Sequence, residues 1–208
     1  MSRASPIVFV VDDDASVRTS LTRLLETSGY VVEAFASARA FLAREPHPGP
    51  CCLVLDVRMP GLTGIQLQEL LAATGRRMSI VFVTGHADVA TSVKAMKAGA
   101  VDLLTKPVDA KDLIAAIQRA VTKDERDRAT EVRVAEIQRR VRLLTPRETE
   151  VLALVVTGML NKQVAAALGI VENTVKVHRA QVMEKMRAGS IAELVRLADE
   201  AGVTVPKT

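Results

Sequence analysis

Apolar residues in the first half of the chain alternate between two patterns. Short runs rich in β-branched residues predict strands, and stretches with apolar residues every three or four positions predict helices. The expected strands cover residues 7–11, 30–35, 51–55, 79–83 and 100–104. Helical spacing recurs at residues 17–25, 65–71, 89–96 and 113–121. This alternation predicts an α/β doubly wound domain, with a five-stranded parallel sheet covered by helices on both faces.

After Arg142 the strand pattern stops and only helical patterns remain. Thr145, Pro146 and Glu148 have the types expected of an N-cap, a first helical residue and an acidic first turn, and Gly158 is expected to end that helix. Further helices are predicted at residues 161–168, 172–186 and 190–201. Gly169 lies between the first two of these, and short helices joined by such a turn are typical of a helix-turn-helix.

The segment Thr122–Arg140 has low apolar density, mixed charge and no glycine or proline. Opposite charges four positions apart, such as those of Asp124 and Arg128, favour a solvated helix, and a disordered linker is the alternative. The pattern therefore predicts three parts, namely an α/β domain, a helical linker and a small all-α helix-turn-helix domain. Their expected bounds are residues 6–121, 122–140 and 141–206.

Composition changes this picture little. The net charge of +4 is spread thinly, so it permits an acidic partner such as nucleic acid without indicating one. No apolar run approaches the roughly 20 residues that cross a bilayer, and the N-terminal residues lack the apolar stretch of a signal peptide. We therefore expect a cytoplasmic protein with no membrane partner.

Cys51 and Cys52 are the only cysteines, and we expect two buried thiols.

Polar residues follow four of the five expected strands. They are Asp12 and Asp13, Asp56, Thr84, and Lys106. The carboxyl ends of parallel strands meet at one edge of the sheet, where ligands bind. Three neighbouring carboxylates need a cation to stay ionised, and Mg²⁺ prefers oxygen ligands of this kind.

An aspartate carboxylate is also a nucleophile that can accept a phosphoryl group. The charge on a transferred phosphoryl group needs a cation and a hydrogen-bond donor, which Lys106 and Thr84 would supply. The set therefore predicts Mg²⁺-dependent phosphorylation of Asp56. Helix capping, a turn, a strand-end hydrogen bond and a solvated charge would each explain one of these residues, but they do not explain the placement of all of them at one edge.

The segments VVDDD, LDVRMPGLTG, VFVTGHAD and AMKAGAVDLLTKP resemble the receiver domain of two-component response regulators. The segment LTPRETEVLALVVTGMLNKQVAAALGIVENTVKVHRAQVMEKM resembles a LuxR-type helix-turn-helix. The combination is similar to FixJ-type regulators of the NarL/FixJ group. The resemblance implies a flavodoxin- or CheY-like receiver joined to a DNA-binding domain, and a transcription factor rather than an enzyme.

For the receiver, the resemblance implies that Asp56 is the phosphoacceptor. Asp12, Asp13, Asp56 and the backbone carbonyl of Arg58 would hold Mg²⁺, for which Mn²⁺ could substitute. Thr84 and Lys106 would bind the phosphoryl group and take part in the switch.

The remaining receiver positions are less uniform. Arg58 and His86 would tune the lifetime of the phosphoryl group. Asp14 stands where the family often has Glu, and we expect it to cap the first helix. Leu103 stands where many receivers have a switching Phe or Tyr, so aromatic switching is in doubt. The Lys106-Pro107 peptide bond is often cis in the family.

On the helix 172–186, we expect Val175, Val182 and Met186, together with the preceding Val171, to face the core. The resemblance implies that Lys176 and Val177 on the opposite face meet base edges. His178 is expected to be structural. The other expected DNA-binding residues are Asn161, Lys162, Asn173, Thr174 and Arg179, of which Asn173 shares the exposed face and the rest would contact phosphates.

The implied partners are a sensor histidine kinase, double-stranded promoter DNA, a second copy of the chain bound through the phosphorylated receiver, and RNA polymerase. Two other interpretations remain open. One is a phosphorylation-gated protein-interaction module. The other is a phosphohydrolase with an aspartyl-phosphate intermediate. Such enzymes usually have an Asp-x-Asp pattern and a substrate cap, whereas here the carboxylates are contiguous and no cap insertion is evident.

Overall fold

A five-stranded parallel sheet lies at the centre of the first part of the chain. The computed structural model describes residues 6–76, 78–85 and 89–203, and the chain divides into two compact units, Met1–Arg128 and Ala129–Thr208. The strands are β1 (Ile7–Val11), β2 (Val31–Phe35), β3 (Cys51–Asp56), β4 (Ser79–Thr84) and β5 (Asp102–Thr105). Their order is β2-β1-β3-β4-β5 and every neighbouring pair is parallel, which confirms the predicted architecture.

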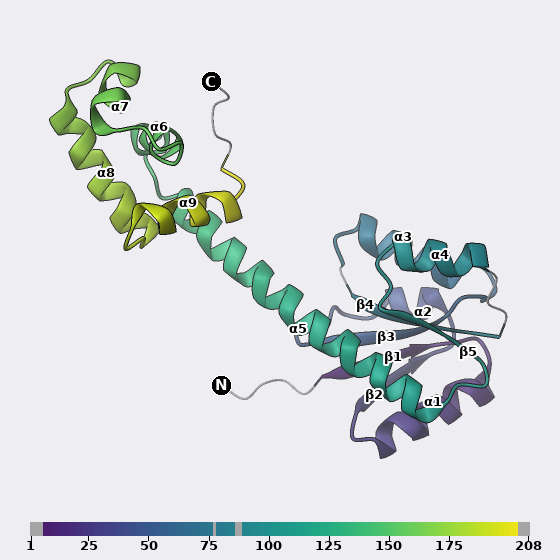
Figure 1. The fold of residues 1–208 in the computed structure, drawn as a ribbon. Coiled ribbons are helices and arrows are strands. Elements are labelled where there is room, and N and C mark those ends of the chain that lie inside the picture. Colours follow the sequence, from purple (N-terminus) through teal and green to yellow (C-terminus); the bar gives the residue numbers. More distant parts are fainter. Residues whose placement is uncertain (1–5, 77, 86–88, 204–208) are drawn as a thin grey trace. The chain divides into compact units, whose positions relative to one another are not determined.

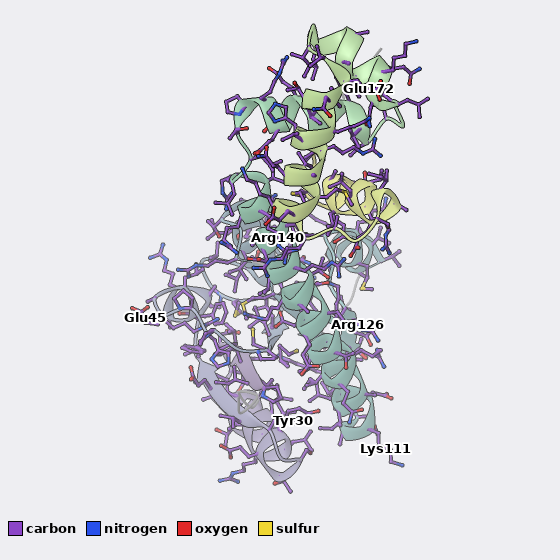
Figure 2. The ribbon with its side chains drawn as sticks, turned by 90° about the vertical axis from the view of Figure 1, so that its left-hand side faces the viewer. Tyr30, Glu45, Lys111, Arg126, Arg140 and Glu172 are labelled. Atoms are coloured by element: carbon purple, nitrogen blue, oxygen red, sulfur yellow. The ribbon has the colours of Figure 1, made fainter. Side chains whose placement is uncertain are left out.

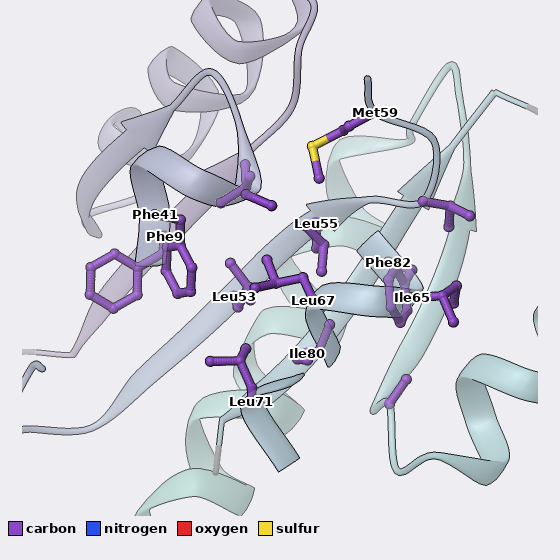
Figure 3. Close-up of a cluster of buried hydrophobic side chains, with 14 of the residues drawn as sticks. Phe9, Phe41, Leu53, Leu55, Met59, Ile65, Leu67, Leu71, Ile80 and Phe82 are labelled. Carbon is purple, nitrogen blue, oxygen red and sulfur yellow. The ribbon is translucent and has the colours of Figure 1, made fainter. Parts of the chain in front are cut away.

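Helices cover both faces of this sheet (Figure 1). One face carries α1 (Ala15–Thr27) and the first turns of α5 (Ala110–Val141), and the other carries α2 (Ala38–Leu42), α3 (Gly64–Ala73) and α4 (Val89–Lys97). The strands β1, β3 and β4 are buried along their whole length, as their continuous apolar runs predict. Figure 3 shows the core on the α2–α4 side, where Phe9, Leu53 and Phe82 of the strands meet Phe41 and Leu67 of the helices.

Some local features differ from the expectation. The helix α2 was not predicted, because its five residues bury only Ala38 and Phe41, too few to make a helical period. The strand β5 begins at Asp102, two residues later than the pattern suggested, and α6 ends before Gly158. Cys51 and Cys52 are buried free thiols, as predicted.

The helix α5 continues through the whole segment 122–140 (Figure 2 shows Lys111, Arg126 and Arg140 at successive positions along it). Within the first unit, the buried carboxylate of Asp124 accepts hydrogen bonds from the Cys51 backbone amide (3.0 Å) and from Arg128 Nε (2.6 Å). The middle of α5 is therefore tied to the start of β3. Further along, Ile137 is 2% exposed and lies in the core of the second unit.

The second unit is a bundle of short helices, α6 (Pro146–Val155), α7 (Asn161–Leu168), α8 (Glu172–Met186) and α9 (Ile191–Glu200), packed with the last turns of α5. Thr145 and Glu148 form the expected capping box at the start of α6. Gly169 ends α7 in the left-handed conformation with φ 65°, which lets the chain turn into α8. None of the described helices is long and apolar enough to span a membrane.

Candidate functional sites

The polar residues predicted at the strand ends come together at the carboxyl edge of the sheet. Asp12 follows β1, Asp56 and Thr84 are the last residues of β3 and β4, and Lys106 follows β5. Asp12, Asp56 and Thr84 are 1%, 7% and 1% exposed. Carboxylate oxygens of Asp12, Asp13 and Asp56 lie within 4.8 Å of one another. The parallel topology thus gathers residues that are far apart in the sequence, as expected.

Lys106 lies between two of these carboxylates. Its Nζ atom is 2.7 Å from Asp12 Oδ2 and 3.1 Å from Asp56 Oδ2. Burial opposes the charged form of Lys106, but its hydrogen bonds to the two carboxylates outweigh this effect and raise its pKa. Its backbone amide donates to the Thr84 carbonyl (2.9 Å), and the Lys106-Pro107 bond is cis. The residue after β5 is thus fixed against the end of β4.

Burial raises the pKa of Asp56, and its hydrogen bond with Lys106 partly offsets this effect. The Arg58 backbone amide also donates to Asp56 Oδ1 (3.3 Å). The Asp56 carboxylate lies close to a cation at the carboxyl edge of the sheet. An oxygen in such a position is suited to nucleophilic attack on a phosphoryl group.

The loop that carries the acidic residues is held by its own hydrogen bonds. Asp12 Oδ1 accepts from the Asp14 amide (2.9 Å), and Asp14 Oδ1 accepts from the Ser16 amide (2.8 Å). The hydrogen bond from Ser16 Oγ (2.6 Å), followed by those from the Ser16 and Val17 amides, lowers the pKa of Asp14, and the amide bonds cap α1, as predicted. Arg18 donates from Nη1 to the Asp12 carbonyl (2.7 Å). Sequence reasoning missed Arg18, because a contact to a backbone carbonyl leaves no pattern in the sequence.

The donor set fits a hard divalent cation. The side chains brought together, those of Asp12, Asp13 and Asp56, offer carboxylate oxygens, and Asp13 is exposed, which leaves space for the water molecules that Mg²⁺ usually retains.

Gly64 is a second residue that the sequence reasoning did not single out. A Cβ atom at this position would lie 2.2 Å from the Asp56 carbonyl oxygen, so only glycine allows α3 to start this close to β3. Gly64 directly precedes the predicted helical pattern 65–71, but the close contact with the Asp56 carbonyl that requires a glycine is visible only in the fold.

Three further receiver positions were singled out in the sequence. Leu103 is half-buried and packs against the core on the α2–α4 side. The side chain of Arg58 is exposed, and His86 lies outside the described residues.

In the second unit, α8 presents the predicted exposed face. Val175, Val182 and Met186 are buried, whereas Asn173, Lys176, Val177 and Ala180 are exposed. The prediction for Val171 was wrong, because this residue is 69% exposed. It is the N-cap of α8, with an extended backbone (φ −78°, ψ 148°), so it does not continue the buried helical face.

Two polar contacts organise this end of the unit. Arg179 Nη1 of α8 donates to Asn161 Oδ1 at the start of α7 (2.9 Å). Lys176 Nζ is 3.6 Å from Glu172 Oε1, and both side chains are largely exposed. Lys162 is exposed and Thr174 is half-buried. The start of α7 and the outer face of α8 therefore place basic, amide and small apolar groups side by side, which suits a duplex major groove and its phosphates.

Comparison with protein families assigns both units. Residues 8–118 match the response regulator receiver domain. Residues 142–198 match the luxR family of bacterial regulatory proteins.

Two relatives match this chain over nearly its whole length. The chain is 46% identical to nodulation protein W of Bradyrhizobium diazoefficiens over 97% of this chain and 89% of the relative. It is 45% identical to the transcriptional regulatory protein FixJ of Azorhizobium caulinodans, over 94% of this chain and 93% of the relative.

Solved structures agree with these relatives. The response regulator StyR superposes with a TM-score of 0.79 at 45% identity, covering 95% of this chain and all of StyR. Full-length FixJ from B. japonicum superposes with a TM-score of 0.58 at 42% identity, covering 98% of this chain and 100% of FixJ. Both the sequence and the fold therefore show that the chain belongs to the FixJ-type two-component response regulators, in which a receiver domain is joined to a LuxR-type DNA-binding domain.

Proposed function

We propose that Asp56 accepts a phosphoryl group from the phosphohistidine of a partner sensor kinase. An Asp56 carboxylate oxygen forms the new P–O bond, the P–N bond breaks, and the histidine nitrogen keeps the electron pair and takes up a proton. Lys106 and Thr84 would stabilise the charge of the acyl phosphate. The observation that carries this proposal is the cluster of Asp12, Asp13 and Asp56 with Lys106 within hydrogen-bonding distance of two of the three.

Asp12, Asp13, Asp56 and the Arg58 backbone carbonyl would hold Mg²⁺, with Mn²⁺ as a substitute. When bound, the ion offsets the negative charge of the carboxylates and of the phosphoryl oxygens. Without the ion, Lys106 is the only cation that pairs with Asp12 and Asp56 among the described contacts.

Phosphorylation then promotes pairing of two receivers through the surface of α4 and β5. The helix α4 supports this step, because Val89, Val93 and Met96 are 81%, 45% and 46% exposed and form an apolar surface flanked by Lys94 and Lys97. Two paired chains present two helix-turn-helix units to paired half-sites on DNA, which raises affinity.

On DNA, Lys176 and Val177 would meet base edges in the major groove, next to Asn173. Asn161, Lys162, Thr174 and Arg179 would contact phosphates, supported by the bond between Asn161 and Arg179. Because promoter DNA and RNA polymerase are the partners of such a regulator, we place its action in the cytoplasm. In this proposal the protein does not turn over a substrate, in keeping with a family of transcription regulators.

DNA affinity before and after phosphorylation tests the proposal. Operator duplexes would be selected from a random pool with the phosphorylated protein, and their affinity measured by fluorescence anisotropy at several salt concentrations. We expect phosphorylation to tighten binding at least tenfold in the wild type and to leave Asp56→Asn unchanged. Absence of salt-sensitive binding to any duplex would instead favour a phosphorylation-gated protein-interaction module.

A further inference from the structure

The helix α4 is attached to the rest of the receiver in an unusual way. Of its described side chains only Ala95 is fully buried, while the larger Val89, Val93 and Met96 are exposed. A surface helix is ordinarily held by its large apolar side chains. Other contacts must therefore hold α4 in place.

One such contact is made by Gln68 of α3, which is 4% exposed. Its Nε2 atom donates to the carbonyl oxygens of Ala95 and Ala98, both at 3.2 Å. These carbonyls lie at the C-terminal end of α4, which ends at Lys97, and the Ala95 carbonyl also accepts from the Ala100 amide (3.1 Å). The amide of Gln68 thus caps α4 from a neighbouring helix.

The other end of the same amide is not satisfied. Gln68 Oε1 is buried and has no hydrogen-bond partner among the described residues. Turning the amide over would not help, because Oε1 would then face two carbonyl oxygens. A buried polar atom without a partner opposes the arrangement that buries it. The contact therefore holds α4, but only weakly.

We propose that Gln68 is a positioning residue that latches α4 in the resting receiver. This inference rests on the proposed function, in which phosphorylation rearranges the surface of α4 and β5. In the resting protein the Gln68 amide fixes the C-terminal end of α4, and its unpaired oxygen keeps the bond easy to break. The strength of this contact thereby sets how much free energy phosphorylation must supply before the dimer surface of α4 and β5 forms.

The test uses Gln68→Met, which keeps the length of the side chain and removes both polar groups. Lys94→Gln is the matched control, because it removes the exposed ion pair between Lys94 and Glu69 (2.9 Å) that joins the same two helices. Hydrogen exchange of the full-length protein, measured without Mg²⁺ or phosphodonor, reports how firmly α4 is held. We expect the α4 amides to exchange about tenfold faster in Gln68→Met and about as in wild type in Lys94→Gln, with β1 and β3 unchanged in both.

The second readout is dimerisation, followed by sedimentation with Mg²⁺ and beryllium fluoride as a phosphoryl mimic. Gln68→Met should dimerise at a several-fold lower protein concentration than wild type. Unchanged or slower exchange in α4, or equal loosening of α4 and the sheet strands, would overturn the latch. A wild type that does not dimerise with the mimic would contradict the proposed function, while the exchange result would still decide whether Gln68 holds α4.

Discussion

At the scale of single residues, Asp56 at the acidic edge of the sheet carries a charge that the proposed reaction needs but that lowers the stability of the fold. Asp56 is buried beside Asp12, and burial raises its pKa even though Lys106 is close. The ionised form of Asp56 is therefore less favourable in the folded protein than in the unfolded chain. In the proposed function the site keeps this unfavourable charge because the charge is needed to bind a cation and to accept the phosphoryl group.

We predict that Asp56→Asn is more stable than wild type at pH 7 by about 1 kcal/mol when no divalent cation is present. A group whose folded pKa is raised contributes stability at low pH and loses it as pH rises through the folded pKa. The advantage of the Asn variant should therefore shrink as pH falls through the folded pKa of Asp56, where the wild-type carboxyl becomes neutral. Urea unfolding with a chelator across the acidic range measures this. A variant less stable than wild type at pH 7 would show that the pair with Lys106 outweighs burial.

Glu148 illustrates the opposite sign in the second unit. It is 2% exposed, caps α6 at the Thr145 amide (2.7 Å) and pairs with Lys185 (2.6 Å). The hydrogen bond from Lys185 lowers the pKa of Glu148, so its contribution is present at neutral pH and is lost as pH falls through its folded pKa.

Glu148→Ala should destabilise the helix-turn-helix unit by about 2 kcal/mol at pH 7, because it removes a cap and leaves Lys185 without its partner. Glu150→Ala, which removes an exposed carboxylate from the same helix, is the control and should cost little. Thermal unfolding at pH 7 compares the two. Equal effects would mean that burial of Glu148 is unimportant.

At the scale of helices and strands, the sequence was informative where long apolar patterns exist. The buried strands and the helices α7 and α8 have the predicted extents or differ by one residue at an end. The sequence was uninformative where a contact depends on a neighbour far along the chain. Gln68 has no special place in its own helix, and its role is visible only when α4 lies against α3. Arg18 and Gly64 were missed for another reason, since each lies against the backbone carbonyl of a residue nearby in the sequence, Asp12 and Asp56 respectively, and such a contact leaves no pattern of side chains.

No sequence pattern predicted the contact between α5 and β3, although Asp124 and Arg128 were noted as a helical pair. Asp124→Ala should destabilise the first unit by about 2 kcal/mol, because the Cys51 amide and Arg128 both lose a buried acceptor. Asp127→Ala, which removes an exposed partner of Lys123 on the same helix, should cost well under 1 kcal/mol. Urea unfolding of the two variants decides whether the helix segment after residue 121 belongs energetically to the receiver.

Substitutions on α8 should distinguish contacts with DNA phosphates from contacts with base edges. Arg179→Met should weaken binding to all duplexes and reduce the slope of log K against log salt by about 0.9, the value for one phosphate. Lys176→Met should reduce discrimination between operator and random duplex by about 1–3 kcal/mol if Lys176 contacts guanine. Anisotropy titrations of both variants on both duplexes measure these effects. The same salt slope in Arg179→Met as in wild type would remove Arg179 from the phosphate contacts.

At the scale of the whole molecule, the order of the parts and their class could be predicted, because the strand pattern gives way to a purely helical one after Arg142. The grouping of the polar residues at the receiver edge could also be predicted, since parallel strands bring their carboxyl ends together whatever the loops between them. The energetic link between phosphorylation and DNA binding could not, since it depends on differences of a few kcal/mol between two states of the same chain.

In the proposed function this link depends on phosphorylation of Asp56, and intact mass together with sedimentation tests that step most directly. Wild type and Asp56→Asn would be treated with Mg²⁺ and a small-molecule phosphodonor. We predict one added phosphoryl group and a shift from monomer to dimer in the wild type, and neither change in the variant. A wild type that gains no phosphoryl group, or an Asn variant that gains one and dimerises, would contradict the role of Asp56 as the switch.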